Sequence, residues 1–283
     1  YNKFMKLMKG NDDYEWAKIP DIKKLEGISK NQRINYLNAT IVIFKAVVPP
    51  INTDELTIYR DEIMKETPSK LDTIFTPKQQ ENLVLKGDVE MMINKIKKEL
   101  LLKKDLFKNG TANTTERNLY QLYVILKIYE LLPIRNEISN VIVIKTKDYK
   151  LLSKEVRENT NYLVINKSKF VFYFNDYKTA ETYGERIVQI PNSLKLIIQK
   201  WIVIKGDDLP NLFVMRAGMG LNNNNLTKWL VRASQKYMGK NVSTVLLRKI
   251  FYTDKYSSMK DELEKDANVA GHSPGMALNS YIA

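Results

Sequence analysis

The chain of 283 residues contains no cysteine and a single histidine, His272. Without cysteine there are no disulfide bonds and no thiolate ligands, and with one histidine a zinc site of nitrogen and sulfur ligands is excluded. A magnesium site built from carboxylates is not excluded by these two counts. The sequence also has neither a GxGxxG nor a GxxxxGK[ST] motif, so we expect no nucleotide and no other cofactor.

Long apolar segments are missing as well. The stretch "LNATIVIFKAVV" is too short to span a bilayer and contains Lys45. No signal-peptide pattern opens the chain, so we expect no membrane partner.

Positive charge is abundant, because 45 Lys and Arg residues against 32 Asp and Glu residues give a formal net charge of +13. A strongly basic chain points to a polyanionic partner, most often nucleic acid, although such charge can also serve solubility alone. The hydrophobic fraction of 44% is sufficient for packed cores.

The N-terminal part is predicted to be helical. Ser29 and Gln32 have the spacing of a capping box, and Pro49 and Pro50 stop the helix that follows. The apolar face of this helix is predicted from residues at helical spacing: Ile34, Leu37, Ile41, Phe44 and Val48. A second helix lies in "NTDELTIYRDEIMKE", and the polar, proline-containing "TPSKLDTIFTPKQQEN" indicates a linker. We therefore expect an all-helical domain in residues 1–75.

In residues 76–283 the spacing of apolar residues changes from that of helices to that of strands and then back to that of helices. Helices are predicted in "GDVEMMINKIKKELLLKK", with Asp88 as a cap, and in "NTTERNLYQLYVILKIYELLP", capped by Asn113 with Glu116. Short strands are then predicted in "NYLVIN", "KFVFYFNDY" and "ERIVQIP", followed by more helices. The predicted fold class is α+β: mainly helical, with helices around a small three-stranded antiparallel sheet in this second domain. The strand–helix alternation of Rossmann or TIM folds is absent from the sequence.

Two arginines occur among apolar neighbours. Arg135 follows the apolar helix in "LLPIRNEISNVIVI", and Arg248 lies within "STVLLRKIFY". A buried guanidinium needs an anionic partner. That partner can be a bound substrate anion or a structural carboxylate, for example Glu137.

Three further polar residues are candidates. Lys178 lies in the turn of "FNDYKTAETYGERIVQIP", where a lysine is usually only solvated. His272 and Tyr281 lie in "AGHSPGMALNSYIA". Taken singly, they fit a hydrogen-bonded structural histidine and a tyrosine on a helix face.

The five residues taken together form a recognisable series, with a lysine between strands, an arginine within LLR, and a GHS motif nine residues before a tyrosine. The series resembles the tyrosine recombinase/integrase family, whose catalytic fold is shared with type IB topoisomerases. The resemblance covers about residues 85–283 and is most similar to the branch found in viruses and mobile elements of eukaryotes. It extends more weakly to an N-terminal domain that clamps DNA. The site residues that it implies are Arg135, Lys178, Arg248, His272 and Tyr281.

The resemblance implies a chemistry without metal or ATP. Arg135 and Arg248 would hold the scissile phosphate, with His272 donating a further hydrogen bond. Tyr281 would attack phosphorus to form a 3′-phosphotyrosine, and Lys178 would protonate the leaving 5′ oxygen. The implied partners are double-stranded DNA and further copies of the chain, as a homotetramer on two synapsed sites, and the protein would act wherever its target DNA lies.

The chain departs from the family pattern at Val245, where relatives usually have a histidine or lysine three residues before the second arginine. Lys249 is the nearest substitute, and Lys167 and Lys169 are alternatives to Lys178. Three other functions are compatible with the sequence: a type IB topoisomerase, a DNA-binding relative with weakened catalysis, and a metal-dependent nuclease or integrase that uses carboxylates.

Overall fold

The computed structural model describes residues 25, 27–65, 77–206, 210–215 and 219–269. The chain divides into two compact units, 1–76 and 77–283. We refer to them as unit 1 and unit 2 and describe each by itself. The predicted linker falls largely outside the described residues.

Unit 1 contains two described α-helices, α2 (Lys30–Ala46) and α3 (Asp54–Lys65), which pack against each other. Their shared core is built from Leu25, Leu37, Ile41, Phe44, Leu56 and Ile63. The predicted apolar face of α2 is therefore largely confirmed. Val48 is 92% exposed, because α2 ends two residues before it.

The predicted capping box of α2 is wrong in detail. The Ser29 hydroxyl donates to Gln32 Oε1 at 2.8 Å and accepts no backbone N–H of the helix. The box predicted for Asn113 and Glu116 is confirmed. Asn113 Oδ1 accepts from Glu116 N at 3.2 Å, and Glu116 Oε2 accepts from Asn113 N at 2.8 Å.

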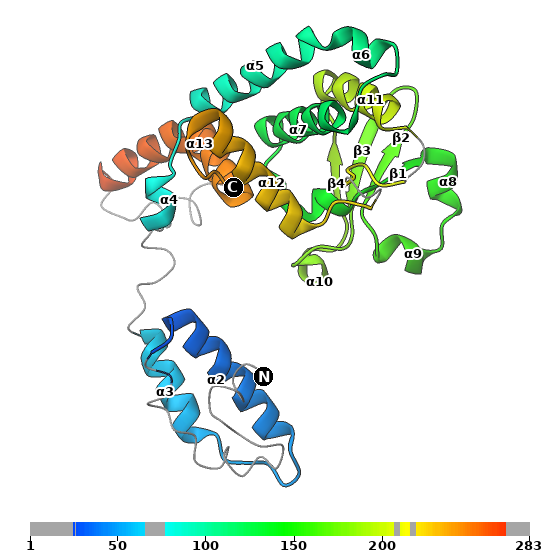
Figure 1. The fold of residues 1–283 in the computed structure, drawn as a ribbon. Helices are drawn as coiled ribbons and strands as arrows, with labels where there is room; N and C mark the ends of the chain where they lie inside the picture. Colours follow the sequence, from blue (N-terminus) through cyan, green and yellow to red (C-terminus); the bar gives the residue numbers. More distant parts are fainter. Residues whose placement is uncertain (1–24, 26, 66–76, 207–209, 216–218, 270–283) are drawn as a thin grey trace. The chain divides into compact units, whose positions relative to one another are not determined.

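Unit 2 is mainly helical, with one small sheet (Figure 1). Its elements in chain order are α4 (Pro77–Glu81), α5 (Lys86–Leu102), α6 (Lys104–Lys108), α7 (Thr114–Leu131), the 3-10 helix η3 (Asn136–Asn140), β1 (Ile142–Lys145), α8 (Thr146–Leu151), α9 (Lys154–Glu158), β2 (Tyr162–Ile165), β3 (Phe170–Phe174), α10 (Ala180–Tyr183), β4 (Arg186–Gln189), α11 (Asn192–Lys205), α12 (Asn223–Met238) and α13 (Thr244–Val269).

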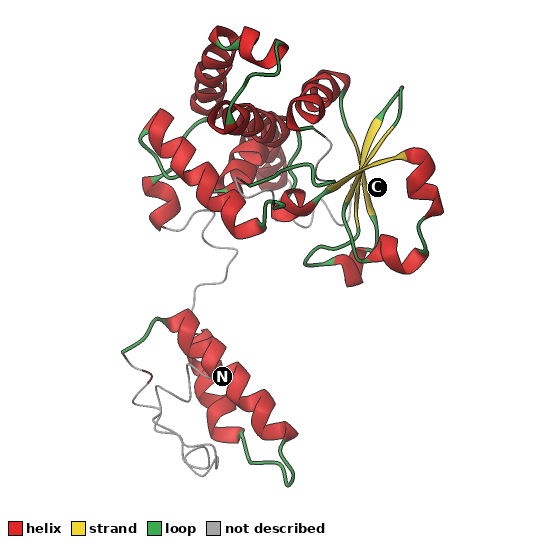
Figure 2. Cartoon of the chain, turned by 45° about the vertical axis from the view of Figure 1, so that its right-hand side comes forward, coloured by secondary structure: helices red, strands yellow, loops and turns green. Residues whose placement is uncertain are grey.

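The sheet has the order β1-β2-β3-β4. Strands β2, β3 and β4 are antiparallel neighbours, with Leu163 opposite Phe172 and Phe172 opposite Val188. Strand β1 pairs with β2 in parallel, and α8 and α9 form the connection between them. Figure 2 shows that these two helices lie on one side of the sheet and the larger group of helices on the other.

The prediction of a three-stranded antiparallel sheet is therefore wrong in two respects, since the sheet has four strands and is mixed. The three predicted strands are present. The missed strand is β1, which has four residues like β2 and β4 but lies at the edge of the sheet and pairs with β2 in parallel.

The core of unit 2 is centred on α7, which packs against α5, α11 and α13. Fully buried Gln121 on α7 exchanges two hydrogen bonds, each of 2.9 Å, with the backbone of Val214. On α11, Trp201 is buried and donates its indole N–H to Leu212 O at 2.7 Å. These bonds fix the segment between α11 and α12 against the helical core. In the part of the chain that the structure describes, no helix is both long and apolar enough to cross a bilayer.

Candidate functional site

Arg135 occupies a loop that begins where α7 ends. Leu132 is extended and Pro133 follows it, so the helix cannot continue. Ile134 is buried and anchors the loop, while the Arg135 side chain is exposed. The buried Tyr129, on the last turn of α7, donates its hydroxyl to Arg135 O at 3.3 Å. The backbone of Arg135 is thus held to the helical core while its guanidinium faces solvent.

Arg248 lies near the start of α13. Ser243 caps this helix, because its hydroxyl accepts from Leu246 N at 3.3 Å. Leu246, Leu247 and Ile250 are buried, which anchors this turn of the helix and leaves Arg248 half-buried.

Arg135 and Arg248 are far apart in the sequence but close in space. Burial lowers the pKa of Arg248 from its usual value, and the positive charge of Arg135 lowers it further. Tyr129, Glu137 and Tyr252 act in the opposite direction. An anion bound between the two guanidinium groups would offset their repulsion, so the two residues form a candidate anion site. We call these two residues the arginine pair.

The arginine pair lacks a carboxylate partner. Among the described residues, neither guanidinium forms an ion pair with an acidic side chain. Glu137, which the sequence suggested as a structural partner of Arg135, is buried and pairs with Arg186 of β4 instead. The positive charge of the pair is therefore left for a ligand.

Arg186 links the Arg135 loop to the loop that carries Lys178. Its guanidinium lies 4.8 Å from the ring centroids of both Phe174 and Tyr177 while it binds Glu137. The Tyr177 hydroxyl donates to Gly184 O at 2.6 Å, which closes the connection between β3 and β4. Lys178 follows Tyr177 in this connection, and its side chain is exposed.

Asn161, which the sequence analysis did not identify, holds the same two loops together. It is fully buried, and its amide donates to Asp176 O at 2.8 Å and to Asn140 Oδ1 at 3.2 Å. Its oxygen accepts from Asn175 N at 2.9 Å and from Asp176 N at 3.0 Å. One side chain thus ties the end of η3 to the start of the connection that carries Lys178.

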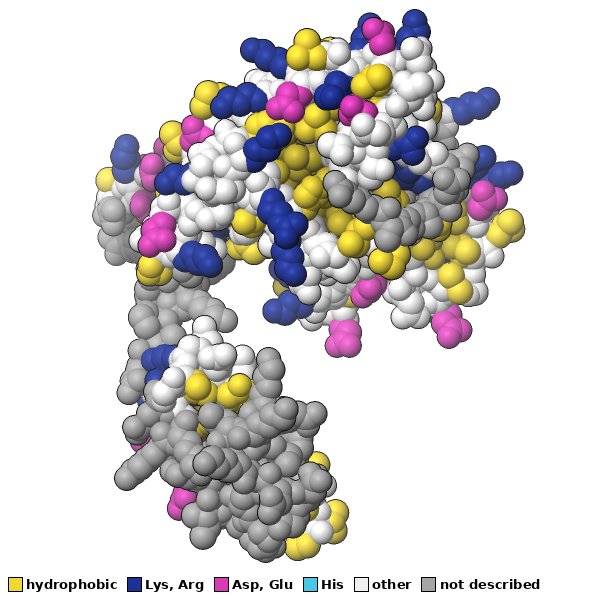
Figure 3. Space-filling model, in the orientation of Figure 1, with side chains coloured by type: hydrophobic (Ala, Val, Ile, Leu, Met, Phe, Trp, Pro, Cys, Tyr) yellow, Lys and Arg dark blue, Asp and Glu magenta, His cyan; other side chains and the backbone are white. Residues whose placement is uncertain are grey.

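Helix α12 continues the basic surface from the Arg135 loop. Asn136 donates to Thr227 Oγ1 at 2.9 Å, and α12 packs on η3. Beyond that contact α12 exposes Lys228, Arg232 and Lys236, which are spaced four residues apart and so share one helix face. In Figure 3 a row of Lys and Arg side chains runs down the middle of the visible face of unit 2, over the region of α12 in Figure 1.

Val245 and Lys249 flank Arg248 on α13. Val245 is 42% exposed and offers no group that transfers protons. Lys249 is half-buried and donates to Gln79 Oε1 at 2.8 Å, so its ammonium group is engaged with α4. Tyr252 also lies on α13, one turn beyond Arg248. Its phenol raises the pKa of Arg248.

His272 and Tyr281 lie outside the described residues. Of the five predicted site residues, the structure brings Arg135 and Arg248 together and connects the loop of Lys178 to them through Arg186 and Asn161. Within the described ranges no group of three or more His, Cys, Asp and Glu side chains is placed to hold a metal ion.

Comparison of the chain with protein-family models, with curated proteins and with solved structures found no match.

Proposed function

We propose that the protein is a site-specific DNA recombinase of the tyrosine type. The observation that carries the proposal is the arginine pair, two positive charges that form no direct ion pair with a carboxylate of the described residues. A phosphodiester is the anion that such a pair suits, because each planar guanidinium can donate two parallel hydrogen bonds to phosphate oxygens.

The cleavage step follows from charge. The pentacoordinate transition state carries more negative charge on the non-bridging oxygens than the ground state does, so Arg135 and Arg248 bind it more tightly. His272 donates a further hydrogen bond to the same oxygens. Tyr281 loses its phenolic proton to water and attacks phosphorus, the bond to the 5′ oxygen breaks, and Lys178 gives that oxygen a proton and takes one back from solvent. The bond energy is kept in the phosphotyrosine, so rejoining needs no nucleotide.

DNA binding rests on the surface around the pair. Unit 1 is the proposed DNA-clamp domain and unit 2 the catalytic domain, with the basic face of α12 neutralising phosphates. Since phosphate contacts release counterions, affinity for duplex DNA should fall steeply with salt concentration. Assembly as a homotetramer on two synapsed sites is part of the same proposal.

Trapping a covalent complex tests the proposal. The wild-type protein is incubated with a nicked duplex that loses its 5′ strand after cleavage, and a protein–DNA adduct is expected on a denaturing gel. Tyr281→Phe should give no adduct. Tyr252→Phe is the matched control, because it removes a phenol one turn beyond Arg248 on α13 and should leave the adduct in place. An adduct that persists in Tyr281→Phe and disappears in Tyr252→Phe would reassign the nucleophile.

A DNA-binding protein that does not cleave is the second candidate. Val245 in place of a proton-transferring residue and the engagement of Lys249 with Gln79 favour it. Binding of duplex DNA by the wild type without any adduct would support this alternative. Relaxation of a supercoiled plasmid that lacks a target site would indicate a topoisomerase instead.

A further inference from the structure

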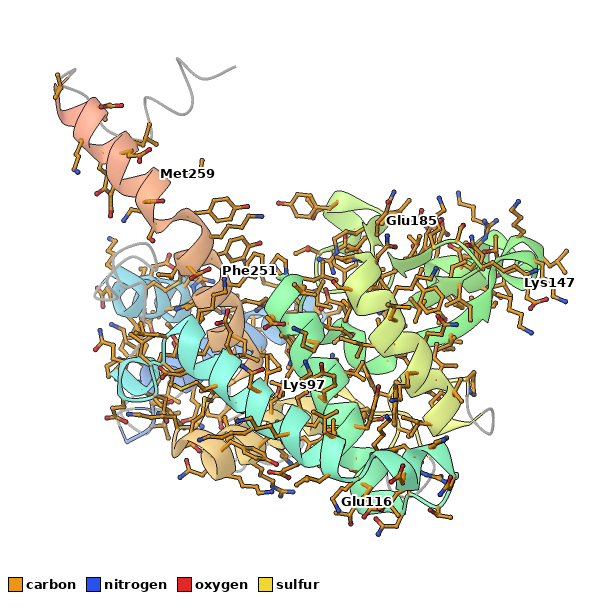
Figure 4. The ribbon with its side chains drawn as sticks, turned by 90° about the horizontal axis from the view of Figure 1, so that it is seen from above. Lys97, Glu116, Lys147, Glu185, Phe251 and Met259 are labelled. Atoms are coloured by element: carbon orange, nitrogen blue, oxygen red, sulfur yellow. The ribbon has the colours of Figure 1, made fainter. Side chains whose placement is uncertain are left out.

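A second feature of unit 2 has no part in the proposed cleavage. A cavity of about 260 Å³ lies where α5, α6, α7 and α11 meet. Figure 4 views these helices from above, with Lys97 labelled on α5. The lining residues are Lys97, Leu100, Leu101, Lys104, Phe107, Tyr120, Tyr123, Ile197 and Lys200. We call it the lysine cavity.

The charges around the lysine cavity are all positive. Lys97, Lys104 and Lys200 are exposed at its rim, and no Asp or Glu lines it. None of the three ammonium groups has a carboxylate partner among the described residues. The Lys200 ammonium lies 5.8 Å from the ring centroid of Tyr120, so it is near the interior of the cavity.

The floor of the cavity holds a hydrogen-bond donor. It is the hydroxyl of Tyr120, a residue that is only 7% exposed. Burial raises the pKa of Tyr120 to about 12, so the phenol keeps its proton at neutral pH. The protonated hydroxyl can therefore donate a hydrogen bond to a carboxylate oxygen that enters the cavity.

The surface beside the cavity is apolar. Leu101 at the end of α5 is 60% exposed. On α11, Leu196 and Val203 are 67% and 78% exposed and lie on the same helix face as Lys200, one turn on either side of it. Exposed aliphatic side chains that surround lysines are typical of a protein-binding surface, whereas nucleic acid offers bases and phosphates but few aliphatic groups.

We infer that the lysine cavity is the docking site of an acidic amphipathic helix from a partner protein. Carboxylates of that helix would meet Lys97, Lys104 and Lys200, and one of them would accept from the Tyr120 hydroxyl. Its apolar side chains would cover Leu101, Leu196 and Val203. Figure 1 shows α5, α6 and α11 at one end of unit 2 and α10, which follows Lys178, at the other. The inference therefore goes beyond the proposed DNA chemistry and stands without it.

A designed peptide tests the inference. The probe is a fluorescent helical peptide with leucines at i, i+3, i+4 and i+7 and with glutamates flanking this stripe. We expect saturable binding to the full chain, measured by anisotropy. Combined Lys97→Glu, Lys104→Glu and Lys200→Glu should weaken binding by about hundredfold or more, because like charges then oppose each other.

Matched variants separate this site from general charge. The same three-fold charge reversal at Lys145, Lys147 and Lys150, which are exposed on β1 and α8, should leave peptide binding unchanged. Tyr120→Phe, which keeps the ring and the packing, should weaken binding by about three- to tenfold through the lost hydrogen bond.

Three results would overturn the assignment. Equal binding of a peptide in which serine replaces every leucine would reduce the site to unspecific charge. If the peptide does not bind, and a DNA oligonucleotide binds in a way that the charge reversal at Lys97, Lys104 and Lys200 abolishes, the face would be assigned to nucleic acid. Self-association of the chain that the charge reversal at Lys97, Lys104 and Lys200 abolishes would identify the face as an interface between copies.

Discussion

The arginine pair and the lysine cavity both collect positive charge without carboxylates, but they hold it differently. Arg248 is carried by helix α13, and Arg135 lies on a loop that Glu137, Arg186 and Asn161 tie to the connection between β3 and β4. The lysines of the cavity are ammonium groups on flexible stems above an apolar floor. Fixed charge can stabilise a transition state because it needs no reorganisation, whereas flexible charge adds affinity and adapts to a partner. The difference predicts chemistry at the first site and recognition at the second.

The strongest way to break this comparison is to remove charge at each site in turn. Arg135→Ala or Arg248→Ala should slow formation of the covalent DNA adduct on the order of hundredfold or more, or about 2–4 kcal/mol of transition-state stabilisation. Lys200→Ala, measured in the same single-turnover assay, should leave the rate within about twofold because it lies in the lysine cavity. Equal losses in all three variants would show that the charge acts only through DNA affinity.

The rigidity of the first site can be tested at its supporting asparagine. Asn161→Ala leaves several buried backbone and amide groups without partners, so the free energy of unfolding should fall by about 3 kcal/mol, measured with urea. Asn166 is the matched control. It is exposed in the turn between β2 and β3 and accepts from Lys169 N at 2.7 Å, so Asn166→Ala should cost about 1 kcal/mol or less. A similar loss in both variants would contradict the role given to Asn161.

The link between the two loops can be weakened without removing a charge from the arginine pair. Glu137→Gln leaves Arg186 without its carboxylate and should slow cleavage roughly tenfold, about 1.4 kcal/mol, with little change in the affinity for duplex DNA. Binding and single-turnover cleavage are measured on the same substrate. A fall in affinity with an unchanged cleavage rate would mean that Glu137 shapes the DNA surface and does not position the reacting groups.

The smallest effect is expected for the thermal stability of the DNA-free protein when a simple anion binds. Sulfate at about five times its dissociation constant should stabilise the fold by about 1 kcal/mol and raise Tm by roughly 2–4 °C. Sodium chloride at equal ionic strength controls for screening. Arg135→Gln should abolish the sulfate effect, and combined Lys97→Gln, Lys104→Gln and Lys200→Gln should retain it. The reverse pattern would place the stronger anion site in the lysine cavity.

Local patterns of the sequence predicted the local structure well. Leu37, Ile41 and Phe44 are buried as their spacing indicated, and the cap of α7 depends on residues only three positions apart. Strand β1 was missed although β2 and β4 are equally short, because its parallel pairing with β2 joins two separate segments and no local pattern encodes it.

The contacts of the candidate site were harder to predict from the sequence. The partner of Glu137 is Arg186, and their contact depends on how β4 joins the sheet, which no local pattern encodes. Asn161 has no signal either, since a buried asparagine in a loop looks the same in sequence as a solvated one. The proximity of Arg135 and Arg248 was suggested only by the family resemblance.

Helix α7 serves both sites. Tyr120 forms the floor of the lysine cavity and Tyr129 holds Arg135, and a rise of about 1.5 Å per residue puts these two tyrosines about 14 Å apart on one stiff rod. A substitution in the buried face of α7, for example at Ile125, would therefore tilt or loosen both ends together. Experiments on either site should therefore use substitutions outside α7, because the effect of a substitution within this helix cannot be assigned to one of the two sites.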